Sequence, residues 1–173
     1  MNIFLVGYMA SGKTTIGLAL AEKMNFKFID LDQYIEDKEN MSIPDIFSIK
    51  GEIYFRKIEG KHLKEIISKE SKSIISLGGG TPCYGNNMEL LVNSKKALTI
   101  YLKASLKELV KRLSVDKEKR PLISHLTKEE ELLEFIGKHL FERSNYYNQA
   151  SRTINVVDKN TENIVEEIIL ELF

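Results

Sequence analysis

The sequence predicts an α/β protein: a three-layer sandwich with a five-stranded parallel sheet between helices. Two observations carry this prediction. Short apolar runs such as residues 3–6 and 97–102 are continuous rather than alternating, as in strands that are buried on both faces. These runs alternate with segments whose apolar residues recur at helical spacing. Such an order of strands and helices produces a parallel sheet with helices on both faces.

The first half of the chain is expected to contribute three strands. Ser42, with Asp45 three residues later, has the spacing of a helix N-terminal cap, and Gly51 ends the short helical piece that follows. We expect strands at 2–6, 26–29 and 73–77, and helices at 13–24, 33–39, about 43–50 and from there to about residue 69.

The second half of the chain continues the alternation of strands and helices, with one irregular segment between two helices. Between two helices, residues 114–126 lose helical periodicity and contain Arg120, which is the place where a mobile lid is expected. We expect strands at 97–102 and 153–156, and helices at 87–92, 105–113, 128–148 and 161–173.

Composition excludes several classes of protein. The chain has 173 residues, which suits one domain, and its 25 basic and 25 acidic side chains leave a net charge of zero. A zero net charge argues against binding dominated by nucleic-acid phosphates, and it is compatible with a monomer. Cys83 is the only cysteine, which excludes a multi-cysteine zinc site. Without a signal peptide or a run long enough to span a membrane, we expect a cytoplasmic protein.

The strongest motif reads Gly7-Tyr8-Met9-Ala10-Ser11-Gly12-Lys13-Thr14 and fits G-x-x-x-x-G-K-[ST] at every fixed position. It lies between a predicted strand and a predicted helix, where backbone N–H groups and the helix N-terminus bind phosphates. Lys13 reaches the β- and γ-phosphates, and the Thr14 hydroxyl ligates Mg²⁺. The alternative is a plain strand-to-helix turn. We expect the nucleotide contacts to come from Ala10, Ser11, Gly12, Lys13, Thr14 and Thr15.

Two more polar motifs follow strands. Asp30 and Asp32 end the second strand, and Gly78 to Gly80 follow the third. Because ligands of parallel sheets bind at the carboxyl ends of the strands, all three motifs should face one crevice. If the strand continues through Asp32, both carboxylates point the same way: one holds the Mg²⁺ hydration shell and the other orients or deprotonates an acceptor hydroxyl. The alternatives are a pair of solvated helix caps and a plain glycine turn.

Three arginines are candidate anion ligands. Arg56 has Glu52 and Glu59 on its own helix face, so an exposed ion-paired helix is the alternative. Arg120 could close over phosphates from the lid or lie free in a loop. Arg143 lies beside an apolar stripe, and a guanidinium there suits a carboxylate of a ligand or of a neighbouring helix.

Six segments, in this order, resemble the shikimate kinases, small P-loop kinases with the nucleoside-monophosphate-kinase type of fold. They cover essentially the whole chain: GYMASGKTTIG, FIDLDQYIE, SIPDIFSIKGEIYFRKIE, SLGGGTPC, RPLI and ERSNYY. The resemblance implies a sheet in the order 2-3-1-4-5 and one domain over residues 1–173. It also implies a substrate-binding insertion at about 32–60 and a mobile lid at about 114–126.

The resemblance implies that ATP, with Mg²⁺, phosphorylates the 3-hydroxyl of shikimate in aromatic amino acid (chorismate) biosynthesis. It assigns roles to residues of this sequence that match the family's motifs. The metal residues are Thr14 and Asp30; Lys13, Asp32 and Arg120 are catalytic; Arg112 lies beside the adenine, and Arg120 acts on the transferring phosphate. Shikimate is bound by Asp32, Arg56, Gly78, Gly79, Gly80 and Arg143.

One departure concerns the phosphate loop, where this family often has Gly-Ala before Gly-Lys and this chain has Ala10-Ser11. Other kinases of the fold, for gluconate or for nucleotides, are the enzymatic alternatives, and a nucleotide-dependent switch is the non-enzymatic one. A nucleotide kinase needs a base-recognition pocket. Two arginines and a glycine wall fit a small carboxylated polyol better, and a switch would not need Arg56, Gly78 to Gly80 and Arg143 to converge.

Overall fold

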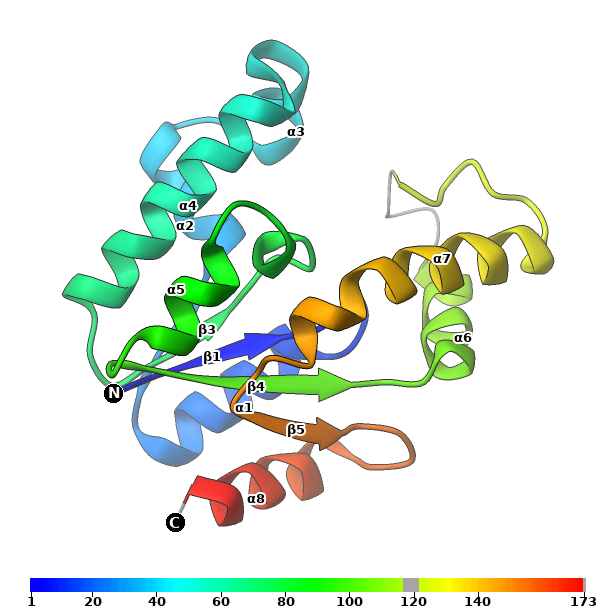
Figure 1. Cartoon of the computed structure of the whole chain (residues 1–173). Helices are drawn as coiled ribbons and strands as arrows, with labels where there is room; N and C mark the ends of the chain where they lie inside the picture. Colours follow the sequence, from blue (N-terminus) through cyan, green and yellow to red (C-terminus); the bar gives the residue numbers. More distant parts are fainter. Residues whose placement is uncertain (117–121, 173) are drawn as a thin grey trace.

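The structure is a computed structural model that describes residues 1–116 and 122–172. Its centre is one parallel sheet of five strands in the order β2-β3-β1-β4-β5, as expected (Figure 1). The strands are β1 (Asn2–Val6), β2 (Lys27–Asp30), β3 (Ser73–Ser76), β4 (Ala97–Lys103) and β5 (Arg152–Asn155).

The central strand β1 is buried along its whole length, which explains its unbroken apolar sequence. Its first residue, Asn2, is polar and fully buried, but its amide donates to the carbonyl of Glu70 and accepts from the backbone N–H of Ser73. The side chain thus ties the start of β1 to the turn before β3. At the other end, β1 runs directly into the phosphate loop.

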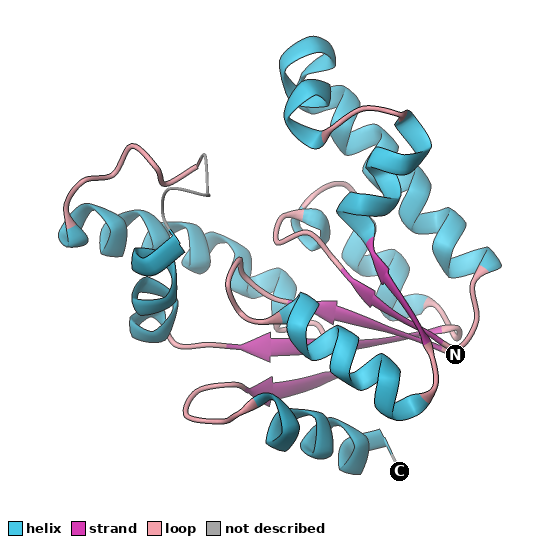
Figure 2. Cartoon of the chain, turned by 180° about the vertical axis from the view of Figure 1, so that it is seen from behind, coloured by secondary structure: helices cyan, strands magenta, loops and turns pink. Residues whose placement is uncertain are grey.

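Helices cover both faces of the sheet (Figure 2). On one face α1 (Lys13–Met24) and α8 (Thr161–Leu172) pack together; on the other lie α5 (Asn87–Asn93) and the C-terminal part of α7 (Glu129–Tyr147). Gly17 allows α1 to approach the sheet closely, because a Cβ there would lie 2.5 Å from the ring of Phe28. The predicted three-layer sandwich is confirmed.

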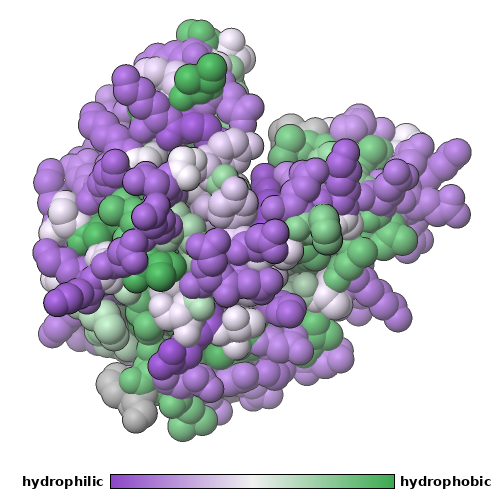
Figure 3. All heavy atoms as spheres, viewed as in Figure 1, coloured by the Kyte–Doolittle hydropathy of each residue, from purple (hydrophilic) through white to green (hydrophobic). Residues whose placement is uncertain are grey.

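Two parts of the chain rise beyond the carboxyl ends of the strands (Figure 1). One consists of α2 (Leu31–Glu39), α3 (Ile43–Asp45), the π-helical turn η1 (Ile46–Lys50) and the N-terminal part of α4 (Gly51–Lys69), which then runs back to the edge where the strands begin. The other consists of α6 (Leu106–Asp116) and the N-terminal part of α7. The space-filling view shows a hollow between them (Figure 3). A 3₁₀ turn, η2 (Thr81–Cys83), follows the three glycines after β3.

Most predicted elements are confirmed within a few residues, and two boundaries differ. The helix after β2 begins at Leu31 rather than at residue 33, so the strand does not continue through Asp32. The helix expected at 105–113 extends to Asp116, which shortens the segment in which we expected the lid. Arg120 and the segment around it lie outside the described residues.

Candidate active site

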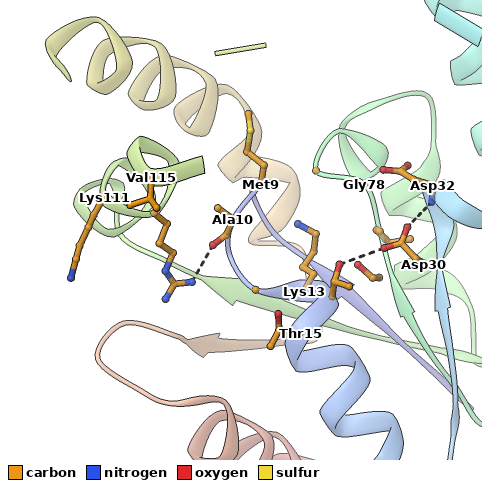
Figure 4. Close-up of a pocket in the computed structure, with 15 residues that line it drawn as sticks. Met9, Ala10, Lys13, Thr15, Asp30, Asp32, Gly78, Lys111 and Val115 are labelled. Atoms are coloured by element: carbon orange, nitrogen blue, oxygen red, sulfur yellow. Dashed lines mark hydrogen bonds between the residues drawn. The ribbon is translucent and has the colours of Figure 1, made fainter. Parts of the chain in front are cut away.

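A cavity of about 660 Å³ opens over the phosphate loop, at the carboxyl ends of β1, β2 and β3 (Figure 4). Its lining residues come from the loop, from the two aspartates after β2, from the glycines after β3 and from α6. The three motifs therefore face one crevice, as expected from the parallel sheet. Of the predicted nucleotide residues, the cavity is lined by Ala10, Gly12, Lys13, Thr14, Thr15 and Arg112.

The phosphate loop holds its lysine inward. Lys13 is only 8% exposed, and its ammonium group donates to the carbonyls of Gly7 at 2.7 Å and Tyr8 at 2.9 Å. Gly12, which precedes α1, has a φ of 96°, a conformation that glycine adopts without strain. Among the residues that the structure describes, no side chain caps the N-terminus of α1, so its first N–H groups are available to a phosphate.

Ala10 and Ser11, the two residues that depart from the family's usual loop, differ in their surroundings. Ala10 has a φ of 63°, in the left-handed region that glycine prefers, and its carbonyl accepts from the guanidinium of Arg112 at 3.1 Å. Ser11 is 1% exposed and does not line the cavity; its hydroxyl has no hydrogen-bond partner among the described residues. Ala10 thus occupies a strained position that Gly would occupy freely.

Asp30 caps the helix that follows it and also lies beside the phosphate loop. One carboxylate oxygen caps α2 by accepting from the backbone N–H groups of Asp32 at 3.0 Å and Gln33 at 3.3 Å. The other oxygen lies 3.5 Å from the hydroxyl of Thr14, across the cavity. The cap fixes the carboxylate beside the phosphate loop (Figure 4).

Asp32 does not cap the helix. It lies in the first turn of α2, and its side chain lines the cavity beside Gly78. The expectation that an extended strand aligns Asp30 with Asp32 is wrong, but the strand-to-helix junction still brings both carboxylates to the same cavity. Burial, and next the neighbouring charges of Asp30 and Glu59, raise the pKa of Asp32 from 3.8 to about 6.

Helix α6 forms the outer wall of this cavity. Arg112 donates to Glu108 at 2.7 Å and to the carbonyl of Ala10, so it is fixed between its own helix and the loop. Lys111 and Val115 line the same wall, and no sequence motif had pointed to either. Val115 is 85% exposed, so an apolar surface lies open on this wall.

A second cavity of about 320 Å³ adjoins the first. All the residues predicted to bind the acceptor line it, although they come from α2, α4, the turn after β3 and α7. Met9, Asp32, Gly78 and Gly79 line both cavities, so the two share a wall. The predicted residues in its wall are Asp32, Arg56, Gly78, Gly79, Gly80 and Arg143; Phe47, Phe55 and Leu122 are among the apolar ones.

Arg56 is held by a buried carboxylate. Its Nη1 donates to Glu59 at 3.0 Å, and Glu59 is 1% exposed. The other oxygen of Glu59 accepts from the hydroxyl of Thr81 at 2.6 Å. The guanidinium also lies 3.7 Å from the ring centroid of Tyr84. Glu52 is 3.5 Å from Nε, so the expected ion pairs exist, but the arginine is mostly buried rather than on a solvated face.

The three glycines allow the guanidinium groups to approach the backbone. A Cβ on Gly80 would lie 3.1 Å from Arg56 Nη2 and 3.4 Å from Arg143 Nη2, and one on Gly79 would lie 3.2 Å from Arg143 Nη1. On Gly78 it would lie 3.2 Å from an Asp32 oxygen. A side chain at any of these positions would narrow the cavity, so the glycines form its wall rather than a plain turn.

Arg143 approaches the same pocket from α7. Within the described ranges, no carboxylate lies within ion-pair distance of it, in contrast to Arg56. One turn further along the helix, the hydroxyl of Tyr147 donates to the carbonyl of Gly79 at 2.6 Å and fixes α7 to the glycine wall. Among the described residues, the guanidinium of Arg56 is thus paired with carboxylates, whereas that of Arg143 is not. A positive charge without a carboxylate partner suits an anionic ligand.

Sequence reasoning missed the buried position of Glu59. It lies four residues after Phe55 and three before His62, on the same face as buried residues of α4, and that spacing was a usable signal. Cys83 is half-buried, and burial raises the pKa of its thiol to about 11. Within the described chain, no group of three His, Cys, Asp or Glu side chains forms a metal site.

Comparison with known proteins identifies the family. The family model described as shikimate kinase matches residues 9–173. A shikimate kinase of Flavobacterium psychrophilum is 47% identical over 172 residues, which is 99% of this chain and 99% of that protein. The crystal structure of the shikimate kinase from Bacteroides thetaiotaomicron has 36% identity and a TM-score of 0.90, and the match covers 99% and 98% of the two chains.

The shikimate kinase from Acinetobacter baumannii, solved in complex with shikimate, is 32% identical with a TM-score of 0.83; the match covers 99% of this chain and 92% of that one. These similarities extend over both cavities and all the elements that build them. This chain belongs to the shikimate kinase family.

Proposed function

We propose that this chain transfers the γ-phosphoryl group of ATP to the 3-hydroxyl of shikimate, in the biosynthesis of aromatic amino acids. The observation that supports the proposal is that the two cavities adjoin and share lining residues. A phosphate loop opens into one of them, two guanidinium groups line the other, and Asp32 belongs to both. This arrangement places a donor and a small carboxylated acceptor on either side of one carboxylate.

On the donor side, the N–H groups of the loop and of the first turn of α1 bind the phosphates. Lys13 now donates to two loop carbonyls, and phosphate oxygens would replace these carbonyls as its acceptors. The lysine thereby neutralises charge on the transferring group. The adenine lies against α6, beside Arg112. We assign a role on the transferring phosphate to Arg120 as well, on the family resemblance alone.

Mg²⁺ fits the donor set beside the loop. The Thr14 hydroxyl and the Asp30 carboxylate lie across from each other, and Mg²⁺ prefers one or two such oxygens together with phosphates and water. The residues Thr14 and Asp30 would hold the ion, which would neutralise phosphate charge and orient the phosphates. The fixed cap at α2 keeps Asp30 in place for this role.

On the acceptor side, Arg56 and Arg143 bind the carboxylate of shikimate, and the ring lies against Gly78 to Gly80. Asp32 accepts a hydrogen bond from the 3-hydroxyl and takes its proton as the phosphoryl group is transferred. A pKa near 6 leaves this carboxylate ionised at neutral pH, yet more basic than an ordinary aspartate. Both features suit a general base.

We further propose that the chain works as a monomeric, cytoplasmic enzyme of one domain. The described residues of a single chain line both cavities and include all the residues assigned to the acceptor. In the described part of the chain, no helix is long and apolar enough to cross a membrane. Light scattering tests the monomer, and cell fractionation tests the location.

A coupled assay of ADP release tests the reaction. ATP and Mg²⁺ are offered with shikimate, with gluconate and with a panel of nucleoside monophosphates. We expect turnover with shikimate and none above the ATP background with the others. Turnover with gluconate or a nucleotide but not with shikimate would overturn the proposed acceptor. ATP hydrolysis that no acceptor stimulates would indicate a nucleotide-dependent switch instead.

A further inference from the structure

Tyr8, the first variable residue of the phosphate loop, contacts α7 through its side chain. Its phenol oxygen lies 2.9 Å from Nδ1 of His139, and the residue is 1% exposed. The two rings meet edge to face, with centroids 5.5 Å apart. No step of the reaction described above uses either side chain, although Tyr8 belongs to the loop that binds the nucleotide.

The phenol is the donor in this hydrogen bond. Burial raises the pKa of Tyr8 to about 12, so the hydroxyl keeps its proton at neutral pH. Burial, and next the charge of Arg143, lower the pKa of His139, so the imidazole is neutral and Nδ1 can accept. Among the described residues, the phenol has no other hydrogen-bond partner. Since a buried hydroxyl needs an acceptor, the bond to His139 is the one that satisfies it.

The backbone of Tyr8 connects this bond to the donor side. Its carbonyl accepts from the ammonium group of Lys13 at 2.9 Å and from the N–H of Ser11 at 3.2 Å. One residue thus bonds the phosphate-binding lysine through its main chain and α7 through its side chain. Any movement of the loop relative to α7 would stretch the bond between Tyr8 and His139.

The side chains that α7 contributes to the site lie on one face of the helix. His139, Arg143 and Tyr147 follow each other at intervals of four residues, which places them one above another. His139 bonds the phosphate loop, and Tyr147 bonds the carbonyl of Gly79. Arg143 lies between them, with its guanidinium carbon 5.8 Å from the ring centroid of Tyr8. The helix is therefore fixed to the donor side at one point and to the acceptor wall at another.

We propose that Tyr8 and His139 are positioning residues for phosphoryl transfer. Their hydrogen bond fixes α7 to the phosphate loop and so holds Arg143 at the distance from the loop that a bound acceptor requires. Neither residue touches a reacting atom; both act through Arg143. The inference rests on the proposed function, because it takes shikimate as the ligand of Arg143.

Three substitutions separate positioning from general stability. Tyr8→Phe removes only the hydroxyl, and His139→Leu removes only the acceptor and keeps apolar bulk. His139→Asn is the conservative rescue, because its amide oxygen takes the place of Nδ1 as an acceptor. Tyr101→Phe is the matched control: it removes the phenol of a tyrosine that is 3% exposed and packs against Tyr147, but that bonds no part of the loop.

The measurements are the Kd of shikimate and the Kd of ADP, both by calorimetry, with kcat and the thermal unfolding temperature. We expect Tyr8→Phe and His139→Leu each to weaken shikimate binding about tenfold, as for the loss of one hydrogen bond, and to leave ADP binding within about twofold. The double variant should be no worse than either single one. His139→Asn should restore most of the affinity, and Tyr101→Phe should match the unsubstituted chain.

Unchanged shikimate affinity in Tyr8→Phe would overturn the inference. Equal losses of shikimate and ADP affinity would also overturn it, because they would indicate a loosened fold rather than a misplaced arginine. Additive losses in the double variant would show that the two side chains act separately. If the unsubstituted chain itself does not bind shikimate, the proposed function fails, which is a distinct result.

Discussion

The phosphate loop is one continuous segment, whereas the acceptor pocket collects its side chains from segments that lie far apart in the chain. We expect the loop to bind phosphates through backbone N–H groups and one lysine, so its proposed role depends on consecutive residues. The pocket depends on contacts between distant elements: Glu59 holds Arg56, Thr81 bonds Glu59, and Tyr147 bonds the glycine wall. Substitutions on the donor side should therefore act narrowly, and those on the acceptor side should spread.

The largest expected effect comes from the residue that the two sides share. Asp32→Asn removes the proton acceptor, so we expect kcat to fall by roughly 10²- to 10⁴-fold. ATP binding should be retained, since Asp30 and Thr14 are unchanged. Kinetics with shikimate and calorimetry with ADP measure the two effects. Equal losses in both would show that Asp32 belongs to the nucleotide site alone.

The same substitution distinguishes a chemical role of Asp32 from a structural one. The pKa of Asp32 is raised from 3.8 to about 6 in the folded chain, so its ionised form destabilises the fold above pH 6, and this cost is absent below pH 3.8. Asp32→Asn should therefore raise the free energy of unfolding at pH 7, by up to roughly 3 kcal/mol. Urea unfolding measures it, and a loss of stability would indicate a structural role.

Arg143→Ala tests the acceptor side alone. The uncompensated guanidinium should account for much of the carboxylate affinity, so we expect shikimate to bind about 100-fold more weakly while ADP binding is unchanged. Arg152→Ala is the matched control, because Arg152 is an exposed arginine on β5 that pairs with Glu171 at the surface. If both ligands bind more weakly to Arg143→Ala, the arginine serves the lid or the fold instead.

Glu59→Gln should show how acceptor-side changes spread. The amide keeps one acceptor oxygen but removes the negative charge that compensates this mostly buried guanidinium, and only the more exposed Glu52 then remains as a charged partner. We expect about tenfold weaker shikimate binding and a loss of about 3 kcal/mol in stability. Glu52→Gln changes an exposed carboxylate 3.5 Å from the same arginine and should cost under about 1 kcal/mol. Comparable effects in both variants would show that the buried carboxylate of Glu59 matters no more to Arg56 than the exposed one of Glu52.

The pH dependence of turnover should report the same carboxylate. Because Asp32 must be ionised to accept a proton, kcat should rise with pH up to about 6 and level off above it. Well below that pH, each unit should lower kcat about tenfold. A pH series with saturating substrates measures this limb, and Asp32→Asn should abolish it. An unchanged limb in that variant would assign it to another group.

The smallest effect is expected in the phosphate loop. Ala10 has a φ of 63°, and relief of this strain by Ala10→Gly is offset in part by the greater chain entropy of glycine in the unfolded state. We expect a gain of at most about 1 kcal/mol in stability and unchanged kinetics. Urea unfolding and ADP binding measure it. A large loss of ADP affinity would mean that the alanine methyl group itself contributes to the donor site.

The sequence alone predicted the fold, because buried parallel strands have continuous apolar runs and the phosphate loop has a fixed spacing. It also predicted that three strand ends meet at one crevice. It placed Asp32 on a strand, because the alternation of Asp30 and Asp32 contains no sign that the helix begins at Leu31. Local spacing cannot distinguish a strand end from a capped helix start.

The contacts that long-range packing creates were harder to predict from the sequence. Arg56 and Glu59 could be paired by their spacing of three residues, but burial of that pair depends on Thr81, in a distant segment. The bond between Tyr8 and His139 spans 131 positions and left no local pattern. Only part of the apolar stripe of α7 meets the core: Ile136 is buried, whereas Leu133 is 44% exposed.

A crystal structure of the chain with shikimate and ADP is the sharpest test of the proposed site. We expect the carboxylate of shikimate on the guanidinium groups of Arg56 and Arg143, and the 3-hydroxyl within hydrogen-bond distance of Asp32, facing the phosphate loop. Shikimate bound with its carboxylate away from both arginines, or with its 3-hydroxyl turned from Asp32, would contradict it.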